Sequence, residues 1–176
     1  FMEARRAEMP ARATRADLAT EFRAQIDAAL AAGVRPTHLD WHCLYDGGRP
    51  DVFELTLGLA REHGLALRVW APAAVERVRG LGLPAADHGT IDSFRLPLDG
   101  KAAQYAELLR NLPPGLSEWA VHPGADDPAS RDLDPNGWPV RSSDFAFLVS
   151  PEARRIVAEE GIVLVGYADL QPAWAG

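Results

Sequence analysis

Two histidines and a carboxylate fall within five residues of one stretch, residues 37–42, which reads Thr-His-Leu-Asp-Trp-His. Imidazole and carboxylate groups commonly carry protons or hold metal ions in proteins, so the stretch suggests acid–base or metal chemistry. Pro36 precedes it, and a segment rich in glycine and ending in proline follows at 46–50. A short segment with β-branched and aromatic residues between such breakers predicts a strand that runs into a loop.

The strand geometry limits which of these side chains can act together. Alternate residues of a strand share a face, so His38, Asp40 and His42 would point the same way. At about 3.3 Å per residue, the two histidines would lie about 13 Å apart, too far to share an ion with bonds of about 2 Å. Asp40 can reach the same ion as His42, or it can orient that imidazole through a hydrogen bond. A helix would pair the histidines at i, i+4 spacing, but Pro36 and the lack of a helical apolar stripe argue against one.

A further histidine, His122, follows the predicted strand at 117–121 and precedes Pro123. In parallel α/β folds, ligands bind at the C-terminal ends of the strands, where both His42 and His122 are expected. Two histidines and an acid in such places suit metal-assisted hydrolysis, in which an ion activates water and a histidine protonates the leaving group. Purely structural roles for single histidines stay open at this point.

Aromatic and charged residues near these positions are candidates for substrate binding. Trp41 and Trp138 could line a sugar-binding surface, although packing against the core is at least as good an interpretation of either indole. Arg68 lies near the end of the strand predicted at 65–70 and is the one well-placed cation. Asp126 and Asp127 follow His122 closely, but acidic loop residues are usually solvated.

The elements that must position these residues alternate between helix and strand. Apolar residues at helical spacing, capping residues and terminal glycines predict helices at 14–33, 51–64, 72–79, 102–112 and 150–161. Apolar runs predict strands at 37–42, 65–70, 91–96, 117–121 and 162–167, with long loops at 81–90 and 123–140. This order is typical of an α/β fold with a largely parallel sheet covered by helices. Five strands are too few to close an eight-stranded barrel, so the sheet is open or the chain holds part of a barrel.

Composition bounds the remaining possibilities. The chain has 176 residues, of which 47% are hydrophobic and 24% charged, as expected for one globular domain. Its 18 basic and 25 acidic residues give a net charge of −7, which argues against a nucleic-acid partner. No apolar run is long enough to span a membrane. With the single cysteine Cys43 and no recognisable signal peptide, a cytoplasmic location is the default expectation.

Two motifs resemble those of a known family. Residues 36–42, Pro-Thr-His-Leu-Asp-Trp-His, resemble the Pro-Thr-His-Leu-Asp-Ser-His signature of the YdjC-like carbohydrate deacetylases, which include the chito-oligosaccharide deacetylases. Residues 118–124, Glu-Trp-Ala-Val-His-Pro-Gly, resemble the second signature, a strand ending in His-Pro-Gly or His-Pro-Ala. The helix before Gly33 and the segment 150–170 also fit, so the resemblance covers nearly the whole chain.

The resemblance implies a (β/α)-barrel-like fold, a divalent metal ion such as magnesium or zinc, and hydrolysis of the acetamide of an N-acetylated sugar. By position it makes His42 a metal ligand and His122 the general acid near the leaving amine. It places Asp40 beside the site, as a further ligand or as the group that orients a ligand. It gives His38 either a structural role or the role of contacting and orienting a metal ligand. The expected function is therefore that of a metal-dependent carbohydrate deacetylase.

The sequence departs from the family pattern in two places. The family opens with a strand that ends in an Asp-Asp pair and has another metal-binding histidine before the 36–42 motif, and this sequence contains neither. Trp41 and the run 43–45, Cys-Leu-Tyr, replace the serine and the histidine-rich tail of the first signature. We therefore expect residues 1–176 to be the C-terminal part of one such domain, lacking its N-terminal strands and binding metal weakly on its own.

Two other functions stay open. A non-catalytic domain that binds a carbohydrate or a partner on the same scaffold would account for the missing ligands. Another metal hydrolase, such as a phosphoesterase, would need more basic residues near the site than Arg68. If strands are missing, exposed sheet edges would favour a homodimer.

Overall fold

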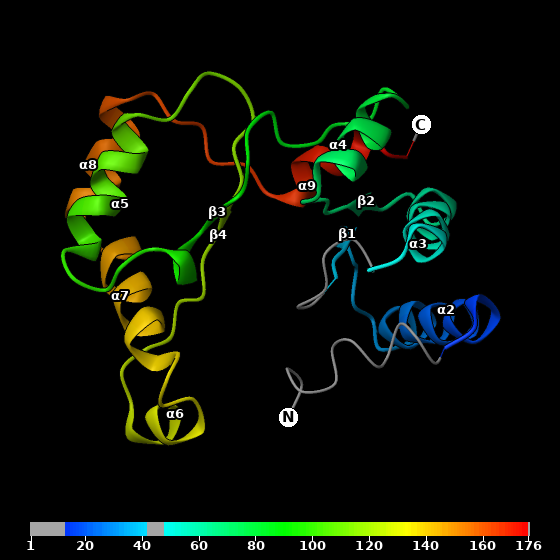
Figure 1. Cartoon of the computed structure of the whole chain (residues 1–176), viewed down its shortest axis with the longest axis horizontal. Helices are drawn as coiled ribbons and strands as arrows, with labels where there is room; N and C mark the ends of the chain where they lie inside the picture. Colours follow the sequence, from blue (N-terminus) through cyan, green and yellow to red (C-terminus); the bar gives the residue numbers. More distant parts are fainter. Residues whose placement is uncertain (1–12, 42–47, 176) are drawn as a thin grey trace. The chain divides into compact units, whose positions relative to one another are not determined.

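The structure is a computed structural model that describes residues 13–41 and 48–175, and it divides into two compact units (Figure 1). One unit comprises residues 1–85 and 165–176, and the other comprises residues 86–164. Both combine helices with short parallel strands, which confirms the mixed α/β class predicted from the sequence. Among the described residues, each ladder has only two strands, so the barrel is not established.

The first unit is built around one parallel strand pair. Its elements are α2 (Arg15–Ala31), β1 (His38–Leu39), α3 (Pro50–Glu62), β2 (Ala66–Leu67), α4 (Pro72–Arg79), α9 (Tyr167–Leu170) and the 3-10 turn η4 (Gln171–Ala173). β1 and β2 pair in parallel with Leu39 opposite Leu67. The strands predicted at 37–42 and 65–70 are therefore present, but with shorter ladders.

Local sequence signals set the ends of these helices. The Thr14 side chain accepts a hydrogen bond from the Asp17 N–H, and the Asp17 carboxylate accepts one from the Thr14 N–H, so α2 starts with a capping box. Pro50 and Pro72 begin α3 and α4, where a missing N–H costs nothing. After α2 the chain turns at Gly33, whose φ of +79° is a conformation that glycine adopts readily.

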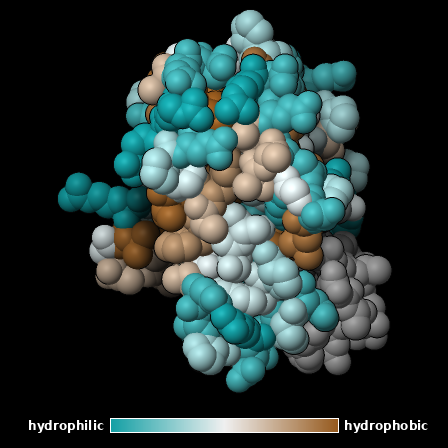
Figure 2. Space-filling model, turned by 90° about the vertical axis from the view of Figure 1, so that its left-hand side faces the viewer, coloured by the Kyte–Doolittle hydropathy of each residue, from teal (hydrophilic) through white to brown (hydrophobic). Residues whose placement is uncertain are grey.

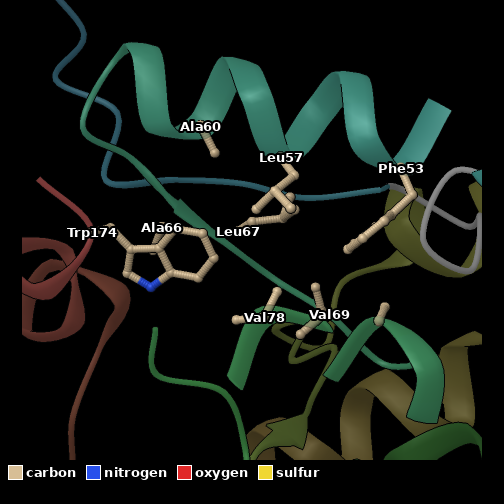
Figure 3. Packing of buried hydrophobic residues seen from close by; sticks show 9 residues of the cluster. Phe53, Leu57, Ala60, Ala66, Leu67, Val69, Val78 and Trp174 are labelled. Carbon is tan, nitrogen blue, oxygen red and sulfur yellow. The ribbon is translucent and has the colours of Figure 1, made fainter. Parts of the chain in front are cut away.

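Helix α3 carries two buried faces. Leu55 and Leu59 pack with Ile26 of α2. Phe53 and Leu57 belong to a second cluster, which Figure 3 shows between α3, β2 and Trp174. The other members of this cluster are Ala60, Ala66, Leu67, Val69, Ala74 and Val78. Burial on both faces makes α3 the central helix of the first unit.

The second unit has the same plan. Its elements are β3 (Ile91–Asp92), the 3-10 turn η3 (Ser93–Arg95), α5 (Lys101–Arg110), β4 (Trp119–Ala120), α6 (Pro128–Leu133), α7 (Trp138–Leu148) and α8 (Pro151–Glu159). β3 and β4 pair in parallel. The core joins α5, α7 and α8 through Tyr105, Leu109, Phe147 and Ile156.

Three sequence predictions are wrong, in whole or in part, in this part of the chain. The strand predicted at 91–96 ends at Asp92, and the 3-10 turn η3 follows it. The loop predicted at 123–140 contains α6 and the start of α7, because Asp127 caps α6 and Pro128 starts it. The strand predicted at 162–167 is absent, and α9 begins at Tyr167. Val163 and Leu164 are 79% and 78% exposed, so this apolar segment is not covered as a central strand would be. Figure 2 shows hydrophobic patches among the hydrophilic surface of one face.

Candidate active site

The parallel register of β3 and β4 brings His122 next to Ser93. Asp92 lies opposite Ala120 in the ladder, so the residues that follow at the C-terminal end of each strand are neighbours. The Ser93 Oγ lies 3.3 Å from the His122 Nδ1, within hydrogen-bond distance. His122 is partly buried, and the Phe94 ring meets its imidazole edge-on with centroids 4.8 Å apart. The predicted position of His122 at a strand end is confirmed.

A buried carboxylate accepts a hydrogen bond from the main chain of His122. Asp144 of α7 is fully buried, and its Oδ2 accepts a hydrogen bond of 2.8 Å from the His122 main-chain N–H. Its Oδ1 accepts a hydrogen bond from the Tyr105 hydroxyl of α5. Burial and the bond to Asp144 raise the pKa of Tyr105, while a hydrogen bond with Ser93 opposes this shift. The phenol therefore stays neutral at physiological pH.

Lys101 supplies the positive charge that balances Asp144. Its Nζ lies 3.9 Å from the Asp144 Oδ1 and donates a 2.6 Å hydrogen bond to the Ser93 main-chain oxygen. The lysine side chain is only 2% exposed. Burial lowers the pKa of Lys101, and the charges of Asp144 and Asp92 act in the opposite direction. Lys101, Ser93, Tyr105 and Asp144 thus form a buried polar cluster beneath His122, and we call it the His122 cluster.

The other candidates near His122 have structural roles. Trp138 is 8% exposed and lies against Gly124, where an added Cβ would come within 3.1 Å of the indole. Trp138 is therefore a packing residue, one of the two interpretations that the sequence allowed. Asp127 caps α6, and Asp126 pairs with Arg131 at 2.6 Å.

In the first unit, the parallel register pairs Asp40 with Arg68. Leu39 lies opposite Leu67, and the next residue of each strand continues the alignment. The Arg68 guanidinium donates to the Asp40 Oδ2 at 3.2 Å and lies 4.0 Å from the centre of the Trp70 ring. Arg68 is partly buried and Asp40 is exposed, and this ion pair brings two of the predicted site residues together at a strand end.

The remaining candidates of this stretch make packing contacts. His38 stacks on Tyr167 with ring centroids 4.2 Å apart, and its Nδ1 lies 3.0 Å from the Thr37 hydroxyl. These contacts agree with the structural role expected for His38. Trp41 packs edge-on against Phe22 of α2 at 5.4 Å and is partly buried. Packing against the core is thus one role of Trp41.

The predicted metal ligand His42 lies outside the described residues. Across residues 13–41 and 48–175, no group of three His, Cys, Asp or Glu side chains could hold a metal ion. Among the described residues, Asp40 is paired with Arg68. The described donors alone therefore do not fit a metal site, and a metal remains a prediction that depends on His42.

Sequence reasoning missed the whole His122 cluster, although signals for it exist. Val140, Asp144 and Phe147 share one face of α7, so a carboxylate occupies a core position among apolar residues. Lys101 and Tyr105 are four residues apart on α5 and share a face in the same way. A charged residue at an apolar helical position is thus the signal that points to a buried polar cluster.

Comparison with known proteins identifies the family. The model of the YdjC-like proteins matches residues 1–159, which is most of the chain and includes both motifs. The chain belongs to the YdjC-like family. A carbohydrate deacetylase of Thermus thermophilus is 34% identical over 156 residues, which cover 79% of this YdjC-like chain. A carbohydrate deacetylase of Clostridium beijerinckii is 26% identical over 155 residues, or 88% of the chain.

A solved structure supports the fold. The YdjC-like chain superposes over 93% of its length, with a TM-score of 0.70 and 20% identity, on an Enterococcus faecalis V583 protein assigned provisionally to cellobiose-phosphate cleavage. The chain spans 54% and 61% of the length of the two deacetylases and 64% of that structure. Within the described part of the chain, no helix is long and apolar enough to cross a membrane.

Proposed function

We propose that the protein containing this YdjC-like chain is a carbohydrate deacetylase that hydrolyses the acetamide of an N-acetylated sugar. The observation that carries the proposal is the placement of His122 at a strand end, with its ring and its main chain both held by buried groups. A general acid must keep one ring orientation through the reaction, and this support provides it. The two relatives named as carbohydrate deacetylases give the substrate class.

His122 acts in this proposal as the acid for the leaving amine. Water adds to the acetyl carbonyl, and the tetrahedral species then collapses with cleavage of the C–N bond. The bond electrons go to nitrogen, which takes a proton from the imidazolium of His122. The two protons of the added water pass to solvent, so acetate and a free amine are the products. Because Ser93 contacts Nδ1, the transferred proton comes from Nε2.

The metal, the barrel and the location belong to the same proposal. A divalent ion, magnesium or zinc, would lower the pKa of a bound water and polarise the carbonyl. His42 is its predicted ligand, with Asp40 and Arg68 beside it, and further ligands would come from residues outside this chain. We propose a (β/α)-barrel-like fold and a cytoplasmic location for the complete protein, and a homodimer remains a prediction.

The test is acetate release from N-acetylated chito-oligosaccharides, with and without added divalent metal. The chain and the longest reading frame that contains it are assayed together, each also as His122→Ala. We expect the longer form to be active and His122→Ala to lose about 10²- to 10⁴-fold in rate. His88→Ala is the matched control, because His88 is partly buried as His122 is, and its Nε2 lies 3.0 Å from the Pro114 carbonyl oxygen. Unchanged turnover in His122→Ala would reject the assigned acid.

A second candidate is a non-catalytic domain that binds a carbohydrate or a partner. The described residues favour it in one respect, because they contain no set of three metal donors. The two functions separate in the same assay. A longer form that binds chito-oligosaccharides but releases no acetate with any divalent metal would be a binding protein.

A further inference from the structure

The turn η3 carries an exposed aromatic side chain beside the proposed acid. Phe94 is 43% exposed, whereas Ser93, the residue before it, is fully buried. The plane of the Phe94 ring makes an angle of 80° with the His122 imidazole, and the two ring centroids are 4.8 Å apart. Single exposed apolar side chains are common on protein surfaces, and the contact with His122 is what sets Phe94 apart from them.

The main chain of η3 fixes the position of this ring. The Asp92 carboxylate caps the turn by accepting a 2.9 Å hydrogen bond from the Phe94 N–H. The buried Lys101 Nζ donates a 2.6 Å hydrogen bond to the Ser93 main-chain oxygen. These two bonds hold the N–H and the carbonyl of the same peptide unit, so the Phe94 side chain projects from a fixed support.

A cation lies over the same ring. The Arg141 guanidinium carbon is 5.7 Å from the centre of the Phe94 ring, within the range of a cation–π contact. Arg141 is itself held by Asp134, whose Oδ2 accepts a 2.8 Å hydrogen bond from the Arg141 Nε. The Arg141 side chain is still 37% exposed, and its guanidinium has further N–H donors that a ligand hydroxyl can accept from.

An apolar ring face bordered by hydrogen-bond donors suits a sugar. The C–H groups of a pyranose form an apolar face, and its hydroxyls lie at the rim. Binding sites for small molecules likewise combine aromatic surface with a few polar groups that fix the orientation of the ligand. We propose that Phe94 is a platform on which the sugar ring bearing the reacting acetamide packs, while Arg141 donates to hydroxyls at the rim of that ring. The inference deepens the proposed function and rests on it for the role of His122.

The position of Phe94 selects the reacting sugar rather than a more distant one. In the proposed reaction, the leaving nitrogen comes within hydrogen-bond distance of the His122 Nε2. That nitrogen is bonded directly to the sugar ring, so the ring lies beside His122, where Phe94 also lies. Phe94 exchanges no proton and contacts the sugar before and during the reaction alike. Its loss should therefore weaken binding more than it slows turnover.

The experiment uses the longest reading frame that contains the chain, with di-N-acetylchitobiose as the ligand. Rates of acetate release give kcat and KM, and isothermal titration calorimetry gives the dissociation constant. We expect Phe94→Ala to raise both KM and the dissociation constant about tenfold, with kcat nearly unchanged. Phe145→Ala is the matched control, because Phe145 of α7 is 40% exposed, close to the exposure of Phe94, and should bind as the wild type does.

Two further variants separate a platform from a structural role. Phe94→Tyr keeps the flat ring and should bind as the wild type does, whereas Phe94→Leu is apolar without a flat face and should lose affinity as Phe94→Ala does. Wild-type affinity in Phe94→Leu or Phe94→Ala, or an equal loss in Phe145→Ala, would overturn the platform.

The calorimetric readout separates this inference from the proposed function. A wild type that binds di-N-acetylchitobiose through Phe94 but releases no acetate with any divalent metal would support the platform and reject the deacetylase. A wild type that releases acetate with the same KM as Phe94→Ala would do the reverse.

Discussion

At the scale of single residues, the most consequential feature is a charge pair with almost no exposure to water. Lys101 and Asp144 are 3% and 0% exposed, and each also makes hydrogen bonds to neutral groups. Removal of one partner from such a pair leaves the other charge buried and uncompensated. The His122 cluster is therefore a sensitive point for stability as well as for chemistry.

We expect Lys101→Met to lower the free energy of unfolding by about 3 kcal/mol, because Asp144 then lacks a counter-charge in the core. Urea denaturation measures this loss. Arg110→Met is the matched control, since Arg110 pairs with Glu152 at 3.7 Å on the surface and its removal should cost less than about 1 kcal/mol. Equal losses in the two variants would contradict the burial of the pair.

Tyr105 predicts how stability changes at high pH. Its pKa is raised by burial and by the bond to Asp144, so the folded chain keeps the phenol proton where the unfolded chain releases it. The unfolded state then binds fewer protons, and stability falls as pH rises above the ordinary tyrosine value of 10.0. We expect the free energy of unfolding of Tyr105→Phe to fall less steeply with pH above that value. The slope should differ from that of the wild type by at most about 1.4 kcal/mol per pH unit, measured by urea denaturation at several pH values. Identical slopes would argue that the phenol titrates normally in the folded state.

At the scale of elements, two glycines with equal room for a side chain differ in backbone conformation. A Cβ added at Gly58, inside α3, or at Gly161, after α8, would meet nothing within 4 Å. Gly161 has a φ of +64°, whereas Gly58 is helical. The room available for a side chain is therefore the same at Gly58 and Gly161, and only the backbone conformation differs.

We expect Gly58→Ala to stabilise the chain by about 0.5–1 kcal/mol, because alanine loses less conformational freedom in a helix. Gly161→Ala should destabilise it by about 1–2 kcal/mol, because the left-handed conformation strains an L residue. Thermal or urea denaturation of the two variants checks the signs. A stabilising Gly161→Ala would mean that α8 does not end in this turn.

The element boundaries show what local sequence signals can predict. Caps and breakers placed α2, α3, α4 and α8 within a few residues, because these signals act over one helical turn. The same chemistry at Asp127-Pro128 marks α6, but it lay within a stretch rich in Asp, Pro and Gly that is typical of loops. The strand predicted at 162–167 is wrong for a different reason. A strand needs a neighbouring strand to pair with, and no local sequence pattern specifies that neighbour.

At the scale of the whole molecule, the register of each parallel pair decides which distant residues meet. The sequence placed His122 and Arg68 at strand ends, but nothing local to them indicates that Ser93 or Asp40 is the neighbour. Alignment of the two ladders supplies those partners, although Ser93 and His122 are 29 positions apart in the sequence and Asp40 and Arg68 are 28 positions apart. A single sequence thus predicted the positions of His122 and Arg68 at strand ends better than the side chains that contact them.

The exposure of the segment after α8 gives a prediction for the folded chain as a whole. We expect Val163→Thr to change the free energy of unfolding by less than about 0.5 kcal/mol, because Val163 is 79% exposed. The same change at Val78, which is 0% exposed, should cost about 1–2 kcal/mol by burying a hydroxyl. Urea denaturation compares the two variants. An equally large loss of stability in Val163→Thr would indicate that residues 162–167 form a buried strand, as the sequence predicted.

The bond between Asp144 and residue 122 runs through the main-chain N–H, which every amino acid except proline possesses. This hydrogen bond can therefore form whatever side chain residue 122 carries, proline excepted. Descendants of this scaffold can exchange the imidazole for another reactive group, natural or engineered, and inherit the anchored backbone unchanged. Asp144 would then be the slower-evolving of the two positions, even though His122 is the proposed acid.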